Sequence, residues 1–155
     1  MPDVIARLLD DGAVVTKVAR AATGRRHADC AAGAVQVDPI PAMSMATGAV
    51  ARVRGNLTEG DDTAAWSVVL KVVHSPDRSP IWTQIPPEFH DITQAQILWR
   101  TEPELYRSAL PDLLPGGLRM PVIYHVDEID ETAMAIWMED VLHADGPWRL
   151  RPTTA

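Results

Sequence analysis

The sequence is poor in several features that whole classes of protein require. It has a single cysteine, Cys30, among 155 residues, so no internal disulfide can form, and one thiol fits a reducing compartment. No apolar run approaches the roughly 18 residues that span a bilayer. The first residues also lack the basic segment followed by an apolar stretch that marks an export signal. We therefore expect a cytoplasmic protein with no membrane partner.

Positive charge is scarce as well. Asp and Glu number 21 against 14 Lys and Arg, which gives a formal net charge of −7. The one basic cluster, Arg25-Arg26-His27, is too short to neutralise a phosphate backbone, so we expect no nucleic-acid partner. The five histidines show no ligand spacing and no Cys-x-x-Cys pair occurs, so we predict no metal site in this chain.

The feature that stands out is a lysine inside an apolar run, Trp66-Ser-Val-Val-Leu-Lys71-Val-Val73. Burying a lysine costs free energy unless an anion meets it. One interpretation is an edge strand whose lysine stem lies on apolar surface while the ammonium reaches water. The other interpretation is that a carboxylate or a ligand anion pairs with the ammonium of Lys71.

The hydrophobic pattern predicts strands, then helices, then a hairpin. A segment with four prolines, 74–87, should be irregular, 55–63 reads as a turn, and 13–18 as a strand or a connector. The expected helices are 4–9, 88–98 and 102–110, and the expected strands are 33–37, 49–54, 66–73, 120–126 and 132–138, with a break at Asp38-Pro39-Ile40-Pro41 and an acidic turn at 127–131. This order predicts an α+β fold with a mostly antiparallel sheet of about five strands and one or two helices packed on one face.

Four segments, in order, resemble the N-terminal lobe of the aminoglycoside phosphotransferase and choline-kinase-like family, which has the protein-kinase fold. They are Val68-Val-Leu-Lys71, Trp99-Arg-Thr-Glu102-Pro-Glu-Leu-Tyr106, Leu114-Pro-Gly-Gly-Leu-Arg-Met-Pro121 and Ala135-Ile-Trp-Met-Glu-Asp-Val141. The resemblance covers roughly residues 33–148. It divides the chain into an N-terminal helix and connector (1–32), a kinase-like lobe (33–142) and a tail after the hinge (143–155).

The resemblance implies that Lys71 contacts the phosphates of ATP and that a helical glutamate positions it. Glu102 is the expected partner, because Leu105 and Tyr106 then follow at the spacing of the family. Glu104 is the rival, and it lies about 200° further round a helix. Without the resemblance, Glu102 could simply favour a helix N-terminus.

Two further groups of nucleotide contacts follow from the same resemblance. Ser44, Thr47 and Gly48 occupy the place of the phosphate loop between the first two strands, although a plain hairpin turn explains this composition equally well. Glu139 and Val141 occupy the hinge, where backbone groups would bind adenine. Met138 and Ile136 could flank the base, although core packing is the commoner role for such residues.

The catalytic motifs of the family lie in a second lobe, which carries a His-Gly-Asp loop and a magnesium-binding Asp. The segment His143-Ala-Asp145-Gly146 imitates that loop but comes too soon after the hinge, so we read it as an ordinary polar loop. We thus expect no catalytic residue and no magnesium in this chain, a truncated or separately encoded lobe, and a partner chain that supplies the second lobe or self-association. The alternative is a non-catalytic α+β binding module built on a curved antiparallel sheet.

Overall fold

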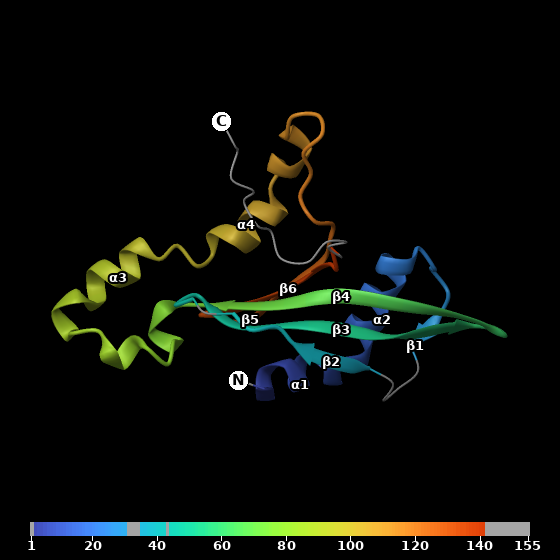
Figure 1. Cartoon of the computed structure of the whole chain (residues 1–155), viewed down its shortest axis with the longest axis horizontal. Coiled ribbons are helices and arrows are strands. Elements are labelled where there is room, and N and C mark those ends of the chain that lie inside the picture. Colours follow the sequence, from blue (N-terminus) through green and yellow to red (C-terminus); the bar gives the residue numbers. More distant parts are fainter. Residues whose placement is uncertain (1, 31–34, 43, 142–155) are drawn as a thin grey trace, which may run out of the picture.

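The chain folds into a curled antiparallel sheet with helices on both of its faces, and the predicted α+β class is confirmed (Figure 1). The computed structural model describes residues 2–30, 35–42 and 44–141. The helices are α1 (Pro2–Asp10), α2 (Gly12–Thr23), α3 (His90–Gln96) and α4 (Thr101–Arg107), with short 3-10 turns at Pro76–Arg78, Trp82–Gln84, Pro87–Phe89 and Leu110–Leu113. The strands are β1 (Asp29–Cys30), β2 (Gln36–Pro39), β3 (Thr47–Glu59), β4 (Asp62–His74), β5 (Ile123–Asp130) and β6 (Ala133–Glu139).

The strands lie in the order β1-β3-β4-β6-β5, and β2 also pairs with β3. The strands β3 and β4 form a hairpin in the middle of this order, and they are the longest strands, with 13 residues each. The expected turn at 55–63 is wrong: pairing continues to Glu59 and Asp62, and the turn needs two residues, with Gly60 first at φ 62°. Glycine suits that position because a two-residue hairpin turn requires positive φ there.

Gly55 was one reason to expect a turn, and the structure gives it another role. It pairs with Trp66 across the hairpin. A Cβ on Gly55 would lie 2.9 Å from Cζ2 of the indole, closer than side-chain carbons approach. The glycine therefore makes room for a tryptophan ring inside a continuous strand.

Strand boundaries differ from expectation at other places, and the strand expected from residue 120 begins at Ile123. The break predicted at 38–41 begins two residues late, since Asp38 and Pro39 still belong to β2. Among the described residues β2 pairs with β3 alone, so it tolerates a residue without an N–H. The expected acidic turn at 127–131 is mostly strand, because β5 continues to Asp130.

Helix α2 occupies the segment expected to be a strand or a connector. The carboxylate of Asp11 accepts hydrogen bonds from the N–H groups of Ala13 and Val14, at 3.1 and 3.2 Å, and so caps the helix N-terminus. Gly24, at φ 72°, ends the helix in the left-handed conformation. The buried side chains of Val15, Val18 and Ala19 then face the sheet.

The main core lies between these N-terminal helices and one face of the sheet. Val18 packs in one cluster with Leu70 and Trp137, all of them fully buried. The predicted N-terminal unit, 1–32, thus shares its core with the sheet. Figure 1 shows α2 crossing the level of β3 and β4, and α4 above these strands. Helix α2 and helix α4 pack against different clusters of sheet residues, so helices lie on both faces and not on one. The tail predicted for 143–155 falls outside the described residues.

Candidate functional site

Lys71 lies on the face of the sheet opposite α2. Residues directly paired across neighbouring antiparallel strands point to the same side. We call this side the Lys71 face and the other the α2 face. The Lys71 face carries Val50, Arg52 and Arg54 from β3, Ser67, Val69 and Lys71 from β4, Ile136 and Met138 from β6, and Asp140 directly after β6.

The ammonium of Lys71 meets a carboxylate. Its Nζ lies 2.5 Å from Oε2 of Glu102, and the two side chains are 24% and 32% exposed. The hydroxyl of Tyr106 donates to the other carboxylate oxygen at 3.5 Å. Burial raises the pKa of Tyr106, and the neighbouring charge of Glu102 raises it further. The pair is therefore partly covered by protein and partly exposed to solvent.

Helix α4 decides which glutamate meets the lysine. Tyr106 from α4 and Trp99 just before it pack against a small cluster of Val73, Met134 and Ile136. This packing fixes the rotation of the helix, so Glu102 points to the sheet while Glu104 is exposed. The structure thus joins Lys71 with Glu102, as the resemblance implied, and leaves Glu104 outside the pair.

Ser44 lies in the loop before β3, next to the end of β4, whereas Thr47 and Gly48, which were expected in the same loop, are the first two residues of β3. Thr47 pairs with Val73, two residues beyond Lys71, and the carbonyl of Ala46 accepts from the N–H of His74 at 2.9 Å. Within the loop, the N–H of Ala46 donates to Oγ of Ser44 at 3.1 Å. The three predicted residues line a hollow of about 460 Å³ together with the segment after β4, and its described lining is Ala42, Ser44, Met45, Thr47, Gly48, Ser79, Pro80 and Ile81. Lys71 is not part of that lining.

The two hinge residues are placed differently. Both the carboxylate and the N–H of Glu139 have hydrogen-bond partners. The carboxylate accepts from Arg119 at 2.9 Å and from the N–H of Val122 at 3.1 Å. The N–H of Glu139 donates to the carbonyl of Val122 at 2.7 Å. The hydrogen bond from Arg119, followed by that from Val122, lowers the pKa of Glu139. Val141, by contrast, is 46% exposed at the exit of the sheet. The N–H of Glu139 is thus already used within the protein.

A second ion pair, which the sequence analysis did not predict, lies on the Lys71 face. Oδ2 of Asp140 accepts from Nε of Arg52 at 2.8 Å and from the hydroxyl of Ser67 at 2.5 Å. The Asp140 side chain is only 5% exposed, whereas that of Arg52 is 34% exposed. The alternation Ala-Arg-Val-Arg in 51–54 could have placed Arg52 on one face with Lys71, but could not have identified its partner 88 positions later.

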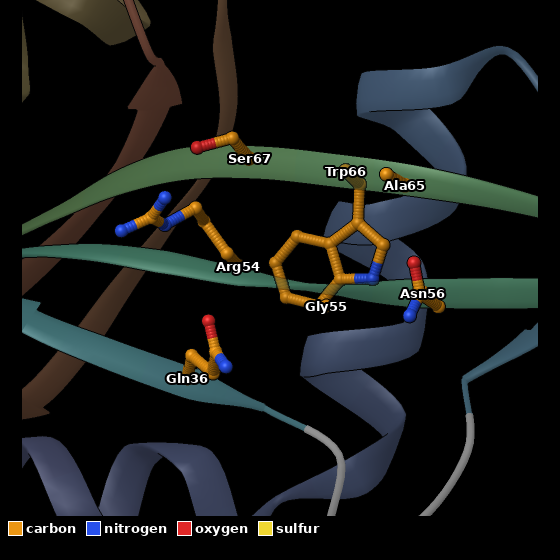
Figure 2. Close-up of a pocket in the computed structure, with 7 residues that line it drawn as sticks. All are labelled: Gln36, Arg54, Gly55, Asn56, Ala65, Trp66 and Ser67. Carbon is orange, nitrogen blue, oxygen red and sulfur yellow. The ribbon is translucent and has the colours of Figure 1, made fainter.

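Figure 2 shows a neighbouring hollow of about 390 Å³, where the indole of Trp66 lies over Gly55. Arg54 at its border pairs with Asp38, and Ser67 belongs also to the Asp140 network. The described lining is Gln36, Arg54, Gly55, Asn56, Ala65, Trp66 and Ser67. The lining combines Arg54 and Ser67, which belong to the Lys71 face, with Gly55 and Trp66, which alternate with them and belong to the α2 face.

Comparison with known proteins adds no identity to this geometry. No family model, no curated protein and no solved structure significantly matches the chain. Over the residues that the structure describes, no helix has the length and apolarity to cross a bilayer. In the same part of the chain, no three His, Cys, Asp or Glu side chains gather where a metal ion could bind.

Proposed function

We propose that this chain is the nucleotide-binding lobe of a small-molecule phosphotransferase that uses ATP, as the resemblance implies. The observation that carries the proposal is the contact between Lys71 and Glu102. A mid-strand lysine held by a helical glutamate is the arrangement that protein-kinase folds use to bind ATP phosphates. The ammonium of a lysine has three N–H donors, so after one of them binds a carboxylate the others can bind a phosphate.

The order of elements around the pair supports the same proposal. The strand with Lys71 follows a loop and a strand, precedes α4, and lies beside the hairpin of β5 and β6. The resemblance predicts this succession of third strand, helix, fourth strand and fifth strand leading into a hinge. The phosphate-loop candidates lie two residues beyond Lys71 on the neighbouring strand.

The residues present fit the phosphate end of ATP better than the adenine end. Lys71 is open to a ligand, and Ser44, Thr47 and Gly48 border a hollow beside its strand. At the hinge, Val141 is exposed, but the N–H of Glu139 is bound to Val122. ATP would supply the transferable phosphoryl group, while Lys71 would hold its charge.

We propose binding rather than turnover for this chain in its cytoplasmic setting. Phosphoryl transfer needs a base to orient the acceptor hydroxyl and magnesium to neutralise charge. The resemblance assigns both to a second lobe, which a partner chain would bring to the Lys71 face. Exposed apolar side chains near α4 and β5 suit such contact or self-association: Leu98, Leu113, Leu118 and Val122.

The two lysines of the sequence allow a sharp test, because Lys17 is a built-in control. Lys17 lies exposed on α2, with its Nζ 3.2 Å from Nδ1 of His125. An acyl-phosphate derivative of ATP transfers its acyl group to a lysine near the bound phosphates. An unguided reagent should label exposed Lys17 first, since Lys71 is ion-paired and less exposed.

We expect preferential labelling of Lys71, which excess ATP suppresses and which peptide mass spectrometry locates. Lys71→Met should weaken ATP binding about tenfold or more, because a charge-assisted contact is lost, and Lys17→Met should not. Labelling of Lys17 alone, or of both lysines without protection by ATP, would contradict the proposal. The non-catalytic binding module would then be the better description.

A further inference from the structure

The side chain of Arg52 lies across the sheet. Arg52 belongs to β3 and Asp140 follows β6, and β4 separates these two strands. The 2.8 Å bond from Nε of Arg52 to Asp140 therefore requires the arginine side chain to pass over β4. Its neighbours there are Val69, with which Arg52 pairs, and Ser67, which donates to the same oxygen of Asp140.

This arrangement holds one edge of the guanidinium and leaves the rest available. Asp140 is 5% exposed and accepts from two donors, so the carboxylate is fixed in place. No described residue accepts a hydrogen bond from the terminal nitrogens of Arg52, whose side chain is 34% exposed. A planar cation is thereby presented, in a fixed position, on the open part of the Lys71 face.

The position of Arg52 relative to Lys71 suits the base of a nucleotide. Lys71 pairs with Val50, two residues from Arg52 on the same strand, so the two cations are diagonal neighbours, about 7–8 Å apart between Cα atoms. The row of Arg52 continues through Val69 to Met138, which gives an apolar floor toward the hinge. A ligand with its phosphates on Lys71 would place its aromatic ring over this row.

We propose that Arg52 binds the nucleobase by stacking, and that Asp140 and Ser67 are positioning residues that hold the guanidinium for this purpose. The inference rests on the proposed function, because it takes the phosphates to lie at Lys71. Guanidinium groups stack on aromatic rings, and the contact is stronger where water is excluded. A second phosphate contact is less suitable, because the fixed Asp140 cancels the charge of Arg52 and the floor beside it is apolar.

Two ligands separate the base from the phosphates: ATP, and inorganic tripolyphosphate, which has no base. Their affinities for the full chain can be compared by titration calorimetry. Arg52→Met should lower the affinity for ATP about tenfold, which is within the range of cation–π contacts, and should leave the affinity for tripolyphosphate unchanged. Arg52→Lys, which keeps the charge but loses the plane, should behave more like Arg52→Met than like the wild type.

Further variants test the positioning role and the specificity of the effect. Asp140→Asn should lower the affinity for ATP less than Arg52→Met does, because it loosens the guanidinium without removing it. It should not lower the affinity for tripolyphosphate. Arg54→Met is the matched control, since Arg54 lies one row away on the same strand and pairs with Asp38. It should leave both affinities unchanged. Thermal unfolding checks that each variant is folded.

The possible outcomes separate the two proposals. If Arg52→Met lowers the affinities for ATP and for tripolyphosphate by the same factor, Arg52 is a phosphate contact and the stacking inference is wrong. If it weakens neither, Arg52 takes no part in binding, which also overturns the inference while the nucleotide lobe stands. If the wild type binds neither ligand, the proposed function fails, and the stacking role falls with it.

Discussion

The two faces of the sheet use the same strands for different purposes. On the α2 face, side chains from β3, β4 and β6 are fully buried against helices, as Val53, Leu70 and Trp137 illustrate. On the Lys71 face, Ile136 is also fully buried, but Val69, Lys71 and Met138 are half-buried. This face includes three cations, Arg52, Arg54 and Lys71, each paired with a carboxylate from outside the hairpin. One face holds the fold together, and the other presents charge that is fixed but reachable.

The contrast shows how a sheet can hold fixed charges on one face at modest cost in stability. Stability comes from apolar area removed from water, which the α2 face supplies. The ion pairs of the Lys71 face add little, because partly exposed pairs contribute about 1 kcal/mol at most. Residues on that face are thus free to serve binding, provided that the opposite face remains intact.

The largest expected effect comes from neighbouring residues on β6 that point to opposite faces. Trp137 is fully buried, whereas Met138 is half-buried on the Lys71 face. Trp137→Ala should lower the free energy of unfolding by about 3–5 kcal/mol, and Met138→Ala by clearly less, because a smaller cavity forms in a partly open site. Urea denaturation measures both. Equal losses would remove the distinction between the faces.

A smaller and better matched pair lies on β4. Val68 is fully buried on the α2 face, and Val69 is half-buried on the Lys71 face. Val68→Thr should cost about 1–3 kcal/mol, since the new hydroxyl is buried without a partner, whereas Val69→Thr should cost less than about 0.5 kcal/mol. The two substitutions are isosteric and adjacent, so a difference in urea midpoint reports the environment alone. A larger loss in Val69→Thr would reverse the assignment of the faces.

The smallest effect is electrostatic and lies at the end of the β5–β6 hairpin, outside both faces. Hydrogen bonds from the hydroxyl and the N–H of Thr132, and then from Arg78, lower the pKa of Asp130 from 3.8 to about 2. Because the folded-state pKa is lowered, this stabilisation is fully present above pH 3.8 and is lost as the pH falls through about 2.

Asp130→Asn should therefore reduce Tm slightly near neutral pH, by an amount equivalent to less than about 1 kcal/mol, because the pair is half exposed. The difference from the wild type should shrink between pH 3.8 and about 2. Asp91→Asn, an exposed change in α3, is the control. A difference in Tm that stays constant through this range would show that the charge of Asp130 contributes nothing.

Sequence patterns predicted the site in part. The run around Lys71 predicted a strand with a cation in need of a partner, and the resemblance selected Glu102, which the structure places at 2.5 Å. Ser44, Thr47 and Gly48 lie beside that strand, but the bound N–H of Glu139 could not be foreseen, because it depends on Val122, which lies just before β5. The roles of these residues in nucleotide binding stay predictions.

The fold was predictable where a residue's neighbours in the chain decide its conformation. Hairpin partners, the proline-rich excursion after β4 and the α+β class all follow from local pattern. The expected turn at Gly55 was wrong because its conformation is set by Trp66 across the hairpin. Helix α2 was missed although its caps, Asp11 and Gly24, are local, because a short helix owes most of its stability to the packing of its apolar face, here Val15, Val18 and Ala19, against the sheet.

By itself, the amino-acid sequence determined which segments alternate, which carry charge and where an unneutralised cation would lie in a strand. These properties are local, since side-chain direction in a strand follows from its two-residue period. Only the tertiary structure decided which carboxylates meet Lys71 and Arg52, because Glu102 and Asp140 come from distant segments that packing brings to one face. Partner choice depends on the rotation of α4 and the exit of β6, and no pattern within one segment encodes either.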